Sequence, residues 1–164
     1  MTAENITPSR TATVGFSPEE IDPAAPTRAA RLKWVVVVDS DLPPGRAVNA
    51  AVCAGAATAV AVTGLLGEDA TDSEGNAHPG LPWAGCTVLT ADAAALRAIR
   101  AKAHASAGTF VADMPAAAQQ TRVYADYLAT LGRTAAEDVG YCAVSIVGPR
   151  NRVDRIVGRL PLMS

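Results

Sequence analysis

Two carboxylates and one arginine lie close together in the segment from Val38 to Arg46, directly after a strongly apolar run. Asp39 and Asp41 offer oxygen atoms for proton transfer, and Arg46, at the expected start of a helix, could hold an anion together with free backbone amides. Open α/β sheets hold ligands at the carboxyl ends of their strands, where this segment falls. Neither a GxGxxG nor a GxxxxGKS/T pattern is present, so a nucleotide fingerprint is absent. The alternative is that both aspartates serve only as turn and cap residues.

A polar stripe on the helix that follows is the second candidate. Arg46, Asn49 and Cys53 recur at spacings of three and four residues, which places them on one face of an otherwise apolar helix. An asparagine there needs a hydrogen-bond partner, whereas Cys53 is also explained as a small residue that fills core space. A cysteine nucleophile would need a base, and the histidines of the chain are His78 and His104.

Three further groups of polar residues carry weaker signals. The loop from Glu68 to His78 does not fit a calcium loop, because positions that need carboxylates hold Ala70 and Leu81, and we interpret it as solvated. Arg133 follows the helix-ending Gly132, where a cation also complements the helix dipole. A basic stripe near the C-terminus is either a solvated helix face or a phosphate contact, and it consists of Arg150, Arg152, Arg155 and Arg159.

The elements that must position these groups follow from the apolar patterns. The run from Leu32 to Val38 is continuous and β-branched, which is typical of a central strand buried on both faces. The other predicted strands cover 86–89, 109–112 and 141–147, and helices are predicted over 45–63, 93–105 and 115–131, with a short one that ends at Gly158. We expect residues 67–85 to form an exposed loop and residues 160–163 to form a tail that packs on the body.

This alternation of strands and helices predicts an α/β fold, a three-layer α/β/α sandwich with a mixed, mostly parallel four-stranded sheet. Residues 1–30 are rich in proline and polar residues and are expected to form an extended N-terminal arm, and residues 31–164 are expected to form one domain. Phe16 could hold the arm against the body or against a neighbouring subunit.

Composition narrows the function classes. The formal net charge of -2 leaves no long-range attraction for polyanions, so DNA binding is not expected and tRNA binding is disfavoured. Cys53, Cys86 and Cys142 lie in apolar runs without CxxC spacing, which favours small buried residues in a reducing compartment. No leader-like or membrane-spanning run is found, and we expect a soluble cytoplasmic protein.

Two blocks resemble the type II peptidyl-tRNA hydrolases. They are LKWVVVVDSDLPPGRAVNAAVCAGAA near the start and LGRTAAEDVGYCAVSIVGPRNRVDRIVGRLPL at the end, together with strands and helices in the order which that family would have. The positions that fit the family are Lys33, Asp41, Leu42, Gly45, Arg46, Ala50, Ala51, Cys53, Ala56, Gly132, Arg133, Thr134, Gly148, Pro149, Asp154, Gly158, Leu160 and Leu162. The resemblance implies the family's fold and hydrolysis of the ester that joins a peptide to tRNA, with no metal and no organic cofactor.

Departures from the family pattern fall on functional positions. Val48, Val52 and Gly55 stand where the family has Lys, Gln and His, and Thr130 replaces an acid. Asp39 stands where the family has a strand-end Arg, which reverses a charge where an RNA phosphate would approach. This pattern is more similar to a sister family of uncharacterised bacterial proteins that share the fold.

Two hypotheses from different classes follow. The first is a hydrolase that acts on peptidyl-tRNA or a related acyl substrate, with Arg46 and Arg133 as anion or carbonyl binders, Asp41 or Asp113 as general base, and Asn49 and Thr134 as orienting groups. The alternative is a non-catalytic module that binds a small ligand or a protein on the same fold. Under either hypothesis the chain could form a homodimer.

Overall fold

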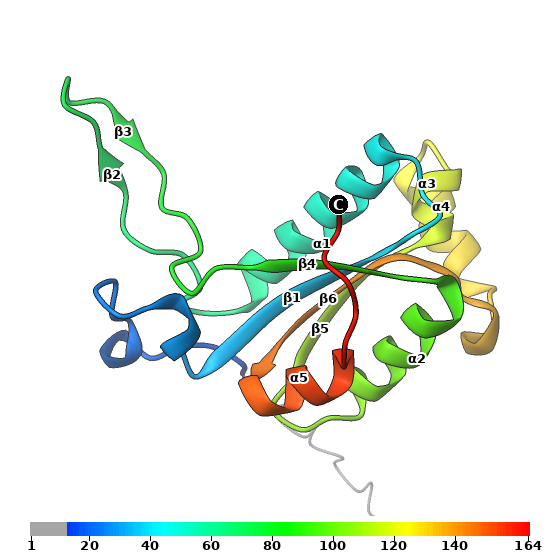
Figure 1. Cartoon of the computed structure of the whole chain (residues 1–164). Coiled ribbons are helices and arrows are strands. Elements are labelled where there is room, and N and C mark those ends of the chain that lie inside the picture. Colours follow the sequence, from blue (N-terminus) through cyan, green and yellow to red (C-terminus); the bar gives the residue numbers. More distant parts are fainter. Residues whose placement is uncertain (1–12) are drawn as a thin grey trace, which may run out of the picture.

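The structure is a computed structural model that describes residues 13–164, so the part of the predicted arm before residue 13 lies outside the described residues. The main strands are β1 (Leu32–Asp39), β4 (Thr87–Ala91), β5 (Phe110–Pro115) and β6 (Tyr141–Pro149), and a short pair is formed by β2 (Ala70–Thr71) and β3 (Ala77–His78). The α-helices are α1 (Pro44–Ala61), α2 (Ala93–His104), α3 (Ala116–Gln120), α4 (Tyr124–Gly132) and α5 (Arg150–Val157) (Figure 1). Short 3-10 turns lie at Pro18–Glu20, Thr27–Ala29 and Ala136–Asp138.

The main sheet has the strand order β4-β1-β6-β5, so β1 is an inner strand as predicted. Val35, Val37 and Val38 are fully buried, which is why this run carries no polar residue. The prediction of a mostly parallel sheet is wrong, because β1 pairs in parallel with β4 whereas β6 runs antiparallel to both β1 and β5. Helices α3 and α4 follow β5 and lie at the end of the sheet where β5 stops. Strand β6 therefore starts at this end and runs antiparallel to β5.

Helices cover both faces of this sheet, which makes three layers (Figure 1). One core cluster joins Val35 and Val37 of β1 to Leu96 of α2 and Val153 of α5. The cluster on the other face joins Val36 and Val38 to the small residues of α1, with parts of α3 packed against it. The buried residues of α1 are Ala47, Ala50, Ala54 and Thr58, whose small side chains let the helix approach the sheet closely.

A buried hydrogen-bonded group fixes α1 over the two inner strands. The Trp34 indole N–H donates to Ser145 Oγ at 2.8 Å, and the hydroxyls of Ser145 and Thr58 lie 2.7 Å apart. Thr58 Oγ1 also donates to the Ala54 carbonyl at 2.8 Å. Among residues 13–164, Ser145 and Thr58 are the polar residues that are buried as a whole, and their hydroxyls are thereby satisfied.

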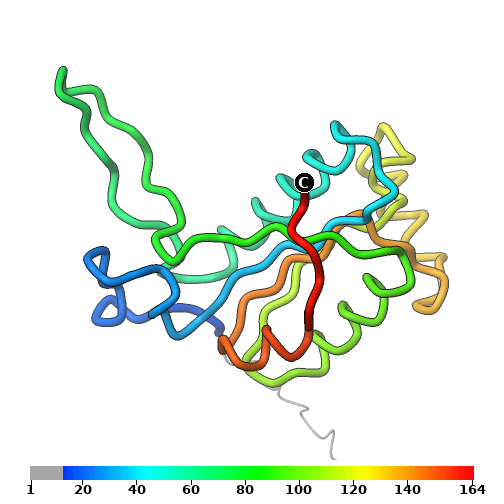
Figure 2. The backbone as a smooth tube through the Cα atoms, viewed as in Figure 1, coloured from blue at the N-terminus to red at the C-terminus, as the bar shows by residue number. Residues whose placement is uncertain are grey.

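Two local predictions are corrected. The single helix expected over 115–131 is two helices, because Thr121 and Val123 adopt extended backbone angles between α3 and α4. Thr121 Oγ1 donates to the Ala117 carbonyl at 3.0 Å, a bond that competes with continuation of the helix. The loop expected over 67–85 contains the β2–β3 hairpin, which projects away from the body (Figure 2).

The outer edges of the two outer strands, β4 and β5, differ in what covers them. The C-terminal tail packs on the body as predicted, because the Thr90 N–H donates to the Pro161 carbonyl at 3.0 Å and the Met163 N–H to the Val88 carbonyl at 3.0 Å. These bonds extend β4 by a short antiparallel bridge between Leu89 and Leu162. Within residues 13–164, no strand pairs with the outer edge of β5.

The described part of the N-terminal segment lies against the body. Phe16 is only 5% exposed, and its ring centroid is 4.8 Å from that of Trp83. The Glu20 carboxylate accepts hydrogen bonds from the Arg31 guanidinium, which lowers the pKa of Glu20 to about 2. Within residues 13–164, no helix has both the length and the apolar character that crossing a bilayer requires.

Candidate functional site

The side chain of Gln119 on α3 links α3 to the start of α1. Its amide oxygen accepts a hydrogen bond from Arg46 Nε at 2.8 Å. Its amide nitrogen donates to the Arg46 carbonyl at 2.9 Å and to Asn49 Oδ1 at 3.2 Å. The structure therefore brings the predicted pair of Arg46 and Asn49 together, through a residue that the sequence analysis missed.

The buried thiol of Cys142 lies against the same amide. Cys142 Sγ is 3.6 Å from Gln119 Oε1, and burial raises the pKa of this thiol although the charge of Arg46 acts in the opposite direction. The thiol therefore stays protonated and donates to the amide. Of the three cysteines, this is the one that is buried as predicted, because Cys53 and Cys86 are exposed. Cys53 differs from the prediction because its stripe of α1 faces a cavity instead of the sheet.

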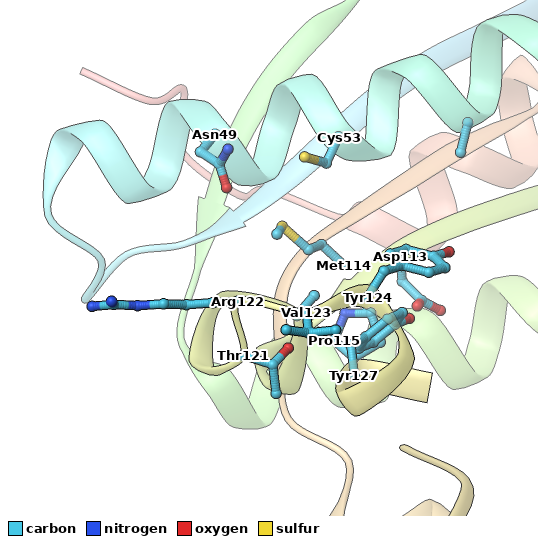
Figure 3. Close-up of a pocket in the computed structure, with 12 residues that line it drawn as sticks. Asn49, Cys53, Asp113, Met114, Pro115, Thr121, Arg122, Val123, Tyr124 and Tyr127 are labelled. Carbon is cyan, nitrogen blue, oxygen red and sulfur yellow. The ribbon is translucent and has the colours of Figure 1, made fainter. Parts of the chain in front are cut away.

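A cavity of about 520 Å³ lies between α1, the end of β5 and the α3–α4 segment (Figure 3). Asn49, Cys53 and Ala57 come to it from one stripe of α1. The cavity is lined in full by Asn49, Cys53, Ala57, Asp113, Met114, Pro115, Ala118, Thr121, Arg122, Val123, Tyr124 and Tyr127. Its wall thus combines aromatic and aliphatic surface with amide, carboxylate, hydroxyl and guanidinium groups.

Asp113, a residue of the cavity lining, is paired with a helix on the other face of the sheet. Arg100 Nε on α2 donates to Asp113 Oδ2 at 3.0 Å, and the Asp113 side chain is 18% exposed. The Arg100 guanidinium also lies 5.6 Å from the centre of the Tyr141 ring. Burial raises the pKa of Tyr127, with further contributions from Tyr124 and Asp113, so its hydroxyl is a proton donor at neutral pH.

Four of the five predicted site residues lie outside this cavity lining, namely Arg46, which Gln119 holds, and Asp41, Arg133 and Thr134. Asp41 is exposed on the turn before α1, where its backbone N–H donates to Asp39 Oδ1 at 3.0 Å, so the turn role considered for Asp39 is the one seen. Thr134 Oγ1 donates to the Thr130 carbonyl at 2.8 Å, and Thr134 borders a separate cavity of about 300 Å³. Arg133 is exposed at the end of α4 and lines neither of the two cavities.

The chemistry that this arrangement offers is binding rather than nucleophilic attack. Cys53 lines the cavity, but His78 lies on the β2–β3 hairpin and His104 at the end of α2, outside the lining residues. The thiol therefore has no histidine base beside it within residues 13–164. The polar groups of the cavity are suited to hold amide and carbonyl groups of a ligand.

Gln119 could have been found from the sequence by one signal. It follows three alanines in a segment predicted to be helical, and a polar amide on a small apolar helix requires a partner. The partners Arg46 and Asn49 are 73 and 70 residues away in the chain, so their identity required the fold.

Comparison with known proteins places the chain in a family and leaves its activity open. A family described as "Protein of unknown function (DUF2000)" matches residues 32–164, which includes the sheet, the helices and the cavity. A solved structure of a protein of unknown function from Agrobacterium tumefaciens is similar with a TM-score of 0.75 and 18% sequence identity, over 82% of this chain and 98% of that one. No curated protein matches.

These comparisons agree with the expected kinship to uncharacterised proteins and with an α/β fold around a mixed four-stranded sheet. Neither description mentions peptidyl-tRNA, so the kinship to peptidyl-tRNA hydrolases stays a proposal. Because the match covers residues 32–164, the chain belongs to the DUF2000 family of proteins of unknown function.

Proposed function

We propose that the cavity beside β5 binds an extended peptide or a peptide-like acyl chain and does not transform it. The observation that carries this proposal is the position of the cavity at an unpaired strand edge. Asp113, Met114 and Pro115 of β5 line the cavity, and within residues 13–164 no strand occupies the outer edge of β5. An open edge offers backbone N–H and C=O groups to an added strand, while an adjacent cavity receives a side chain of that strand.

The size and lining of the cavity fit such a ligand. A volume of about 520 Å³ lies within the range of small-molecule sites. Val123 and Tyr124 are 55% and 74% exposed at its wall, so apolar surface remains for a ligand to cover. Since β5 has six residues at about 3.3 Å each, a peptide of four to six residues could lie along it.

Ester hydrolysis is the second candidate, and one observation favours it. Asp113, which is one of the two carboxylates considered as a general base, lines the same cavity as Asn49. The substrate would be peptidyl-tRNA or a related acyl ester, as the resemblance to type II peptidyl-tRNA hydrolases implies. Binding is preferred because Arg46 is engaged by Gln119, and because Arg133 and Thr134 lie outside the cavity lining.

The test of binding compares two neighbouring alanines of α3. Ala118 lines the cavity beside β5, whereas Ala117 lines the separate cavity of about 300 Å³. A mixture of blocked tetrapeptides is titrated into the labelled protein, and the backbone amide chemical shifts of residues 110–114 are followed. We expect Ala118→Phe to weaken binding by about tenfold or more, because its ring fills the cavity, and Ala117→Phe to leave it unchanged. Equal binding by both variants, or no shift in β5, would contradict the proposal.

The test of hydrolysis is turnover of peptidyl-tRNA by the same preparations. The binding proposal predicts release at the background rate from the unchanged protein and from Arg46→Ala, Asp113→Asn and Arg133→Ala alike. Turnover by the unchanged protein that is lost in Asp113→Asn would replace binding by hydrolysis as the function of this cavity.

A further inference from the structure

Helix α1 has one face whose role the proposed function does not explain. Ala47, Ala50, Ala54 and Thr58 face the sheet, and Asn49, Cys53 and Ala57 face the cavity. A third face of α1 points to solvent and carries a residue at every fourth position. These residues, here called the outer stripe, are Val48, Val52, Ala56 and Val60. The three valines of the outer stripe are 56%, 63% and 90% exposed.

The outer stripe is unlike the surface of an ordinary solvent-facing helix. Residues 47–61 contain no Asp, Glu, Lys or Arg, whereas exposed helix faces normally carry charged residues. The opposite layer follows the ordinary pattern, because exposed positions of α2 and α5 hold Arg97, Lys102, Arg152 and Arg155. A row of Val and Ala also lets a second helix approach closely.

The β2–β3 hairpin (residues 67–82) rises from the body beside the C-terminal end of α1 (Figures 1 and 2). Its two strands pair only with each other, and all four strand residues are exposed. An isolated two-stranded hairpin is marginally stable in water, so it gains from a surface to pack on. From its base to its turn the hairpin spans about 20 Å at roughly 3.3 Å per residue, which is twice the diameter of a helix.

The two ends of α1 carry different charges. The hairpin carries Glu68, Asp69, Asp72 and Glu74 and no Lys or Arg. The other end of α1 holds charges of both signs, with Asp39 and Asp41 in the turn before it and Arg46 in its first turn. Beside this end, Arg122 is exposed and points away from the other residues of the cavity (Figure 3). Since α1 has 18 residues, these two regions lie about 27 Å apart along its axis.

We propose that two copies of this chain form a twofold dimer in which the outer stripes pack antiparallel. This arrangement places the acidic hairpin of each copy beside Arg122 of the other, at the rim of the other copy's cavity. A twofold interface must be self-complementary, and this arrangement sets the uncharged outer stripes against each other and each acidic hairpin against Arg122 of the partner. The dimer does not depend on the proposed function, because it is measured without any peptide.

The first test is the mass of the full-length protein in solution, by light scattering and sedimentation. The expected mass is twice the chain mass of 16.7 kDa. Val52→Glu should weaken the dimer by about 100-fold, because two carboxylates would be buried near the twofold axis. Ala101→Glu introduces the same charge at an exposed position of α2 and should leave the dimer intact. A monomeric unchanged protein, or a dimer that withstands Val52→Glu, would overturn the proposal.

The second test exchanges charges between the hairpin and the cavity rim. Glu74→Arg and Arg122→Glu should each weaken the dimer by about tenfold, because each creates a like-charge contact. The double variant should recover the original dimer constant, since each reversed hairpin again meets an opposite charge on the partner. Glu74 and Arg122 make no side-chain hydrogen bond or ion pair in the described residues, so the fold should be unaffected. A double variant weaker than either single one would overturn the placement of the hairpin.

Discussion

The two outer edges of the sheet are treated in opposite ways. The outer edge of β4 is covered by the C-terminal tail, which adds two backbone hydrogen bonds at 3.0 Å and packs Met163 on the face that α1 covers. The outer edge of β5 has no such cover within residues 13–164, and a cavity of about 520 Å³ lies beside its end. Proteins usually cover or blunt exposed edges because these recruit other strands.

This difference indicates which edge is available for binding. Residues 161 and 163 bond to β4 and cover its outer edge. The open edge of β5 lies where Asp113, Met114 and Pro115 border a cavity with polar and aromatic side chains. The covered edge is thus a contribution to stability, and the open one is a candidate for recognition.

The largest expected effect comes from uncovering β4. Deletion of residues 160–164 removes the two hydrogen bonds and the packing of Leu160 and Met163 on the two cores. We expect the free energy of unfolding to fall by about 3 kcal/mol, measured by urea denaturation. Hydrogen exchange of the Thr90 amide should accelerate at the same time.

A point variant separates the tail's backbone from its exposed side chain. Leu162 is 67% exposed, so Leu162→Ser should change the free energy of unfolding by less than about 0.5 kcal/mol. If the deletion costs no more than this variant, the tail does not support β4 and the comparison of the two edges fails.

A smaller loss of stability is expected when the ion pair between Arg100 and Asp113 of β5 is removed. Arg100→Met removes the ion pair to Asp113, whose side chain is 18% exposed, and the cation beside the Tyr141 ring. Loss of one partner of this half-buried pair should cost about 1–2 kcal/mol in thermal or urea unfolding. Arg97→Met is the matched control on the same helix, because Arg97 is exposed and donates only to the Glu137 carbonyl. Equal costs for both would mean that the ion pair does not stabilise the open edge.

The smallest expected effect is the alkaline titration of Tyr127 in the cavity. Burial raises the pKa of Tyr127 above its ordinary value of 10.0, so the folded chain holds this proton more tightly than the unfolded chain. The resulting stability is complete below pH 10 and is lost as the pH rises through the raised pKa. Tyr127→Phe should reduce the alkaline loss of stability and leave stability at neutral pH nearly unchanged. Identical pH profiles of both proteins would show that the cavity does not shield this hydroxyl.

The sequence predicted those parts of the fold that depend on local apolar pattern. The run Val35–Val38 has no polar residue because both of its faces are covered, and this is readable from the residues alone. Strand direction is not readable in that way, because an apolar run looks the same in a parallel and in an antiparallel pair. The break at Thr121–Val123 was missed because one β-branched pair in an Ala-rich segment is a weak signal for a helix end.

The candidate site was predicted in part for a similar reason. Helical spacing placed Arg46, Asn49 and Cys53 on one stripe, and Asn49 and Cys53 of that stripe do line a cavity. The expectation that Asp41, Arg46, Arg133 and Thr134 share this cavity depended on long-range packing, which no spacing within one helix encodes. The α3–α4 segment that supplies half of the cavity wall was expected to be an uninterrupted helix, so its contribution could not be foreseen.

Hydrogen exchange of the β5 amides measures whether the edge of β5 is open and whether it binds peptides. In the free protein, the amides of residues 110–114 that point away from β6 should exchange rapidly, whereas the Thr90 amide under the C-terminal tail should be protected. Saturating blocked tetrapeptides should protect those β5 amides by about tenfold or more and leave Thr90 unchanged. If peptides protect no β5 amide, or if these amides are already protected in the free protein, the open edge is not a binding site and the account is contradicted.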